Sequence, residues 1–160
     1  MTKQYLNILI ESLQKKNYIL TELITKNEEQ AALLKQEKFD EAAFDRVVDE
    51  KGKLIDGLNP LDEGFESIYE RIHVEMESEA GKKAYASEIR KMQDLIRSIT
   101  EKSMTIQAGE ARNKQAVEAF FRREREQIKN GRTNSKAAMN YYRNMKQTNF
   151  VEPYFLDSKK

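Results

Sequence analysis

The sequence contains no cysteine, no tryptophan, one histidine and only two prolines among its 160 residues. Without cysteine, the chain has no disulfide and no thiolate for a metal or a substrate. It also lacks a glycine-rich phosphate-binding loop and a Gly-x-Ser-x-Gly turn, the motifs that position phosphates and nucleophilic serines. The sequence therefore predicts a protein that is not an enzyme and that binds no cofactor.

The single histidine, His73, is the obvious candidate for a metal ligand. Glu70 and Glu77 lie at helical spacing from it. A lone imidazole between carboxylates on a charged helix is more often solvated than metal-bound, and no Glu-x-x-His pair of a di-iron bundle is present. We therefore predict no metal site.

Long helices are favoured by a composition that is 34% charged and 39% hydrophobic, with few prolines and glycines. The longest pattern covers residues 82–130, which as one helix would be about 74 Å long at ~1.5 Å per residue. Such a helix must bury its apolar face against other helices or another chain. The residues of that face recur at steps of three, four and seven: Tyr85, Ile89, Met92, Ile96, Ile99 and Ile106.

A first helix is predicted over residues 2–36. Four leucines share one heptad series, and further apolar residues widen the face to that of a bundle helix. Asn27 belongs to the same series, either as a residue that sets the register or as a polar residue at the edge of the face. The leucines are Leu6, Leu13, Leu20 and Leu34.

A second helix is predicted over residues 41 to about 58, with Asp40 as its N-cap. Phe39 precedes the cap and is expected to pack on Phe44 as a hydrophobic staple. Lys51 lies on the apolar face of this helix. We expect its stem to cover apolar surface while its ammonium group stays in water.

Pro60 indicates a break in the chain, because proline disfavours helical geometry at the residue before it. Asp62 can cap the helix that follows, and Ala80–Gly81 is a helix-ending turn. The predicted fold is therefore all-α: an elongated antiparallel helical bundle of three passes, the middle one broken near Pro60, with a long third helix. The predicted domains are a bundle over residues 1–130 and a C-terminal tail over residues 131–160, with a short helix over residues 135–145.

Charge is distributed unevenly: residues 1–80 carry a net charge of −8 and residues 111–160 a net charge of +7. The two regions could attract each other, or the basic one could face a partner. Acidic residues interrupt the basic region, so we predict no nucleic-acid binding. The apolar runs are too short for membrane insertion.

The remaining function class is protein recognition by apolar and aromatic helical faces. For residues 117–128 the alternative is burial against residues 39–65 or against the tail. The candidate partner-binding residues are Val117, Phe120, Phe121, Met139, Tyr142, Met145, Phe150, Tyr154 and Phe155.

Several segments resemble the FlgN-type flagellar export chaperones. They are YLNILIESLQKKNYILTELITKNEEQAALLKQEKFDEAAF, VVDEKGKLIDGL, IRKMQDLIRSITEKS and the tail ending in YFLDSKK. The resemblance covers roughly residues 3–130.

The resemblance implies a cytoplasmic helical chaperone. Such a chaperone binds helical C-terminal segments of hook–filament junction proteins, keeps them unpolymerised and delivers them to the type III export gate. Members of this family usually contact clients and gate through their C-terminal region. The alternative is an adaptor that self-associates as a coiled coil, and the chain is expected to be a monomer or a homodimer.

Overall fold

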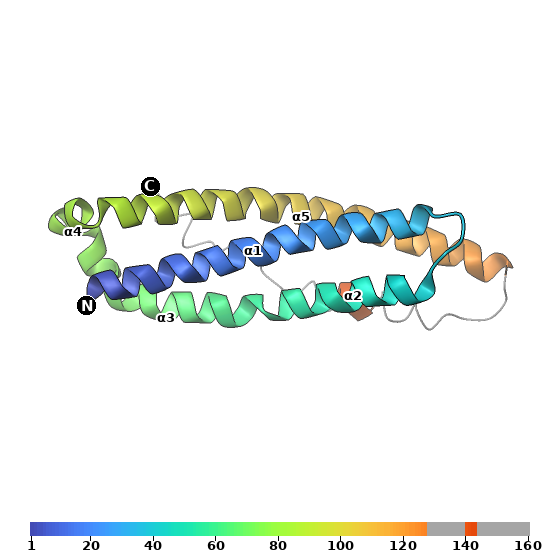
Figure 1. The fold of residues 1–160 in the computed structure, drawn as a ribbon, viewed down its shortest axis with the longest axis horizontal. Helices are drawn as coiled ribbons and strands as arrows, with labels where there is room; N and C mark the ends of the chain where they lie inside the picture. Colours follow the sequence, from blue (N-terminus) through green and yellow to red (C-terminus); the bar gives the residue numbers. More distant parts are fainter. Residues whose placement is uncertain (128–139, 144–160) are drawn as a thin grey trace. The chain divides into compact units, whose positions relative to one another are not determined.

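A computed structural model describes residues 1–127 and 140–143. The fold is all-α as predicted, and the described part of the chain contains no strand (Figure 1). The helical contacts form two units. Unit 1 contains Met1–Leu20 and Gly57–Ser103, and unit 2 contains Thr21–Asp56 together with the described residues after Ser103.

The first helix, α1, spans Thr2–Lys35 and contributes to both units. Its end lies one residue before the predicted one. The predicted leucine series forms much of its buried face, because residues seven apart lie on the same side of a helix. The buried leucines are Leu6, Leu9, Leu13, Leu20 and Leu23.

The second helix, α2, spans Glu41–Asp56 and begins as predicted. The backbone N–H of Ala43 donates a hydrogen bond to Oδ1 of Asp40 at 3.0 Å, which satisfies one of the free donors of the first turn. The ring centroids of Phe39 and Phe44 lie 5.5 Å apart. Both the cap and the hydrophobic staple are confirmed.

The middle pass is broken, but at Gly57 rather than after Pro60. The third helix, α3, spans Leu58–Glu77 and contains Pro60 in its first turn. The missing N–H of proline is tolerated there, because first-turn donors have no partner within the helix. Asp62 does not cap a helix. It accepts a hydrogen bond from Lys16 Nζ at 2.8 Å.

The predicted helix over residues 82–130 is divided, and this prediction is wrong at its start. Helix α4 spans Glu79–Ala84, and α5 begins after Tyr85 and spans Ala86–Gln127. The helix end lies at Ser78, whose Oγ accepts from the N–H of Gly81 at 3.0 Å. Gly81 lies inside α4. A Cβ there would lie 2.0 Å from the carbonyl oxygen of Glu75, so glycine permits a close approach.

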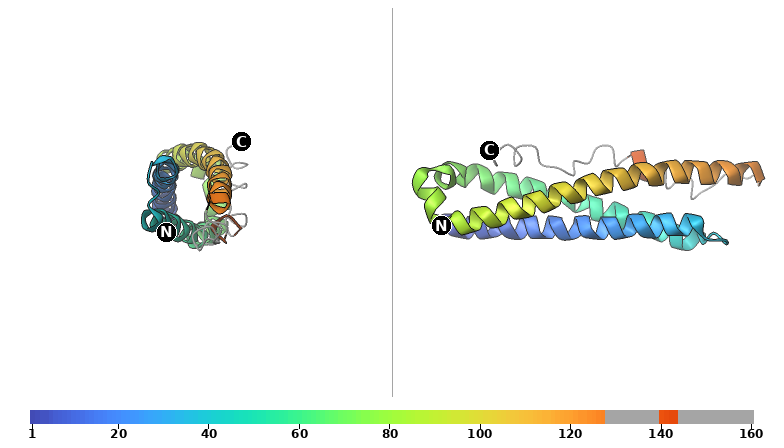
Figure 2. Two further views of the ribbon diagram at one scale, coloured as in Figure 1. Left: turned by 90° about the vertical axis from the view of Figure 1, so that its right-hand side faces the viewer. Right: turned by 90° about the horizontal axis from the view of Figure 1, so that it is seen from above.

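Three helical segments lie side by side in each unit, and successive passes run antiparallel (Figures 1 and 2). In unit 1 they come from α1, α3 and α5, and in unit 2 from α1, α2 and α5. The helical bundle predicted from the apolar periodicity is therefore confirmed. The predicted end of the long helix near residue 130 lies outside the described residues.

Candidate partner-binding site

Four phenylalanines gather in unit 2 where α2 begins. Phe39 lies 4.6 Å from Phe120 and 6.2 Å from Phe121, measured between ring centroids. Phe121 also packs edge-on against Phe44 at 5.9 Å. Phe44 and Phe121 are buried, whereas Phe39 and Phe120 are half-buried. Such edge-to-face and tilted pairs are the favoured geometries of aromatic rings.

Two of the predicted partner-binding residues of α5, Val117 and Phe121, are buried within unit 2. The phenylalanine contacts place this part of α5 against residues 39–44. For Val117 and Phe121 the structure therefore has the burial that was the alternative to partner binding. Phe120 is half-buried, so it is the most exposed of the three predicted residues on α5.

A polar cluster lies deeper in unit 2, around the fully buried side chain of Lys51. Its Nζ donates to Oε1 of Gln30 and to Oε1 of Glu110, each at 2.6 Å. One member comes from each of the three helices α1, α2 and α5. We call Gln30, Lys51 and Glu110 the polar socket. The expectation that the ammonium group of Lys51 stays in water is wrong, because Glu110 supplies the opposite charge inside the unit.

The described helical residues 140–143 pack against the polar socket with two tyrosines. Tyr142 is 2% exposed and its hydroxyl accepts a hydrogen bond from Nε2 of Gln30 at 2.9 Å. The hydroxyl of Tyr141 donates to Oε2 of Glu110. Nζ of Lys51 lies 4.4 Å from the ring centroid of Tyr141 and 5.5 Å from that of Tyr142, within the range of cation–π attraction.

Burial shifts the pKa values of Lys51, Tyr141 and Tyr142. It lowers the pKa of Lys51 to about 8, and the neighbouring charge of Glu110 limits that fall. Burial, and then Glu110, raise the pKa of the Tyr141 hydroxyl above its usual value, and the pKa of Tyr142 is raised for the same reasons. At neutral pH both phenols of the cluster are therefore uncharged.

Further polar side chains of α5 are buried, each within its own unit: Ser103 in unit 1 and Asn113 in unit 2. Asn27 is buried as well, so its interpretation as an edge residue is wrong. Its backbone oxygen accepts from Nδ2 of Asn113 at 3.1 Å, while its own side-chain N and O atoms have no hydrogen-bond partner among residues 1–127 and 140–143. Gly109 leaves room for this amide, because a Cβ there would lie 3.2 Å from Asn27 Nδ2.

Four of the nine predicted partner-binding residues lie in unit 2: Val117, Phe120, Phe121 and Tyr142. Phe120 and Phe121 belong to the phenylalanine cluster, whereas Tyr142 lies at the polar socket. The polar socket and Tyr141 were not predicted as site residues. Opposite charges at apolar positions of two helices, Lys51 and Glu110, were the signal that could have indicated a buried pair. The other five predicted residues lie outside the described residues: Met139, Met145, Phe150, Tyr154 and Phe155.

None of the family models, curated proteins or solved structures compared with the chain matches it. Among residues 1–127 and 140–143, no three histidine, aspartate or glutamate side chains are grouped so as to hold a metal ion. His73 stacks on Tyr69 with ring centroids 5.6 Å apart, and its Nδ1 lies 3.6 Å from Glu77. No helix in the described part of the chain combines the length and the apolar character needed to cross a membrane.

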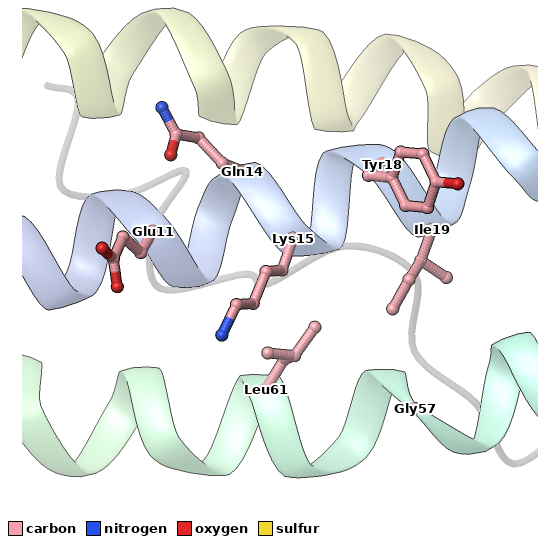
Figure 3. Close-up of a pocket in the computed structure, with 7 residues that line it drawn as sticks. All are labelled: Glu11, Gln14, Lys15, Tyr18, Ile19, Gly57 and Leu61. Carbon is pink, nitrogen blue, oxygen red and sulfur yellow. The ribbon is translucent and has the colours of Figure 1, made fainter.

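Unit 1 contains an open pocket of about 840 Å³ between α1 and α3 (Figure 3). Lys15 extends from α1 toward α3, where Leu61 faces it. Tyr18 lines the same pocket and is 65% exposed. The charged groups of the lining are Glu11 and Lys15. This lining of opposite charges and aliphatic groups is less specific than the polar socket of unit 2.

Proposed function

We propose that the protein is a chaperone that binds a helical segment of another protein through unit 2. One observation carries the proposal: unit 2 already holds a short helical segment, residues 140–143, and buries both of its tyrosines. A surface that accepts one helical turn with aromatic side chains has the chemistry required for a helix-in-groove complex.

The resemblance to the FlgN-type chaperones gives the class of client. The proposed clients are hook–filament junction proteins, held unpolymerised in the cytoplasm through their helical C-terminal segments before delivery to the type III export gate. Binding would bury apolar surface that otherwise drives polymerisation, at ~25 cal/mol per Å² before ordering costs are subtracted. Phe120, a half-buried member of the phenylalanine cluster, supports an apolar contact with a partner in unit 2.

Isothermal titration calorimetry with the C-terminal segment of a hook–filament junction protein tests this function. We expect one segment to bind per chain. In the variant Tyr141→Ala/Tyr142→Ala we expect tighter binding, because the client then no longer competes with residues 140–143. The control is Tyr18→Ala, which removes an exposed tyrosine of unit 1 and should leave the affinity unchanged.

Two results would contradict the proposal. The first is no heat of binding with either the wild type or the double variant. The second is self-association that rises with concentration in sedimentation experiments without any client binding, which would favour the coiled-coil adaptor instead.

A further inference from the structure

Two polar atoms of the polar socket make no hydrogen bond to another member of the socket. Lys51 uses Oε1 of Gln30 and Oε1 of Glu110. The two remaining atoms are Nε2 of Gln30, which donates, and Oε2 of Glu110, which accepts, while the third N–H of Lys51 is left for the aromatic rings that lie over Nζ. A segment that covers the socket must satisfy both, because an unpaired polar group costs free energy when it is buried.

The two tyrosines of residues 140–143 form hydrogen bonds with these two atoms. The phenol of Tyr142 accepts from Gln30, and the phenol of Tyr141 donates to Glu110. A hydroxyl can do either, since it carries one donor and two acceptor sites. The aromatic faces also lie within reach of the Lys51 ammonium group. Phenylalanine would keep the ring contacts and leave the amide and the carboxylate without partners.

The balance of charge in the polar socket also restricts which side chains it can accept. The ammonium group of Lys51 and the carboxylate of Glu110 balance each other inside the socket. A lysine, arginine, aspartate or glutamate side chain placed there would add an unpaired buried charge. The best occupant is therefore uncharged, aromatic and hydroxyl-bearing.

We infer that the polar socket is a tyrosine-recognition site, and that the helical segment it takes from a partner protein carries a tyrosine whose hydroxyl bonds to Glu110. This inference rests on the proposed function and names the side chain that a client presents. In the free chain Tyr141 and Tyr142 occupy the site.

Two peptides test the inference on the full-length variant Tyr141→Ala/Tyr142→Ala, which has a vacant socket. One has the sequence of residues 136–147, and the other differs only by phenylalanine at both tyrosine positions. We expect the tyrosine peptide to bind at least about tenfold more tightly, because the phenylalanine peptide leaves two polar groups unpaired. Fluorescence anisotropy of labelled peptides measures both affinities.

A third arm identifies the atom responsible. In the vacant-socket variant with Glu110→Met added, the acceptor is gone and the difference between the two peptides should shrink several-fold. Circular dichroism confirms that each variant remains helical. The matched control is Glu126→Met, which removes an exposed carboxylate of the same helix.

The peptide affinities test tyrosine recognition separately from the proposed function. Equal affinities for the two peptides would overturn tyrosine recognition and leave helix binding intact. No binding of either peptide up to about 1 mM would overturn tyrosine recognition and remove the observation on which the proposed function rests.

Discussion

Replacing Lys51 by methionine tests how strongly the buried ion pair is coupled to folding. Methionine fills a similar volume but removes both 2.6 Å hydrogen bonds of Nζ. The carboxylate of Glu110, which is 1% exposed, would then be a buried charge without its counter-ion. Breaking a buried pair in this way typically costs 3–5 kcal/mol. We therefore expect the free energy of unfolding to fall by about 3–5 kcal/mol.

The double variant Lys51→Met/Glu110→Gln separates the ion pair from ordinary packing. Glutamine keeps the shape of Glu110 without its charge, so the remaining loss is that of neutral hydrogen bonds, about 1–3 kcal/mol. The double variant should therefore be more stable than Lys51→Met alone. The control is Lys53→Met, because the side chain of Lys53 is 76% exposed and pairs with Asp49 at the surface. Its cost should stay below about 1 kcal/mol.

Chemical denaturation at pH 7, followed by far-UV circular dichroism, measures all three variants. Equal stabilities of Lys51→Met and Lys53→Met would show that the buried ion pair is not coupled to folding. A double variant less stable than Lys51→Met would show that an unpaired Glu110 carboxylate is not the cause of the loss.

Three further predictions concern pH and helix ends. The pKa of Lys51 is lowered to about 8 in the folded chain, so the unfolded chain binds more protons above pH 8. The free energy of unfolding should therefore rise by about 2 kcal/mol from pH 8 to 10 relative to that of Lys51→Met, measured by denaturation at each pH. The same dependence on pH in both proteins would exclude the pKa shift. Gly64→Ala should raise the melting temperature, because no atom of the described residues lies within 4 Å of the added Cβ and alanine favours the helix by about 1 kcal/mol. Gly81→Ala should lower the melting temperature through the clash with the end of α3. The reverse order of the two melting temperatures would show that the close approach is absent. Ser78→Ala should cost about 1 kcal/mol in denaturant unfolding, because it removes the cap on the N–H of Gly81, and a neutral result would contradict the cap.

Local rules accounted for most of the fold. The seven-residue leucine series set the buried face of α1, and Asp40 and Phe39 set the start of α2 through contacts only three to five residues apart. Periodicity and capping depend on neighbours along the chain, which are visible in the sequence. This is why the helical bundle and the beginnings of its first two helices could be predicted.

The helix boundaries near Pro60 and Gly81 were harder to predict, because proline and glycine each occur in two structural contexts. Proline disfavours helix before it but is well accommodated in a first turn, and Pro60 has the second role. Glycine ends helices, but it also allows close packing, as Gly81 does. Only the position of the neighbouring helix decides between these roles.

The polar socket could not be derived from local pattern. Lys51 pairs with a carboxylate 59 residues away on another helix, and the sequence does not state which residues of two helices face each other. The predicted solvation of its ammonium group followed from treating α2 alone. Tyr142 was expected at a partner surface because of its aromatic character, but its hydrogen bond to Gln30 joins residues 112 positions apart.

Amide hydrogen exchange of the full chain, with and without the C-terminal segment of a hook–filament junction protein, tests whether unit 2 binds such a helix. We expect slower exchange in unit 2, around Lys51 on α2 and Glu110 on α5, when the segment is bound. Protection confined to unit 1, or no change in any peptide at saturating segment, would contradict it.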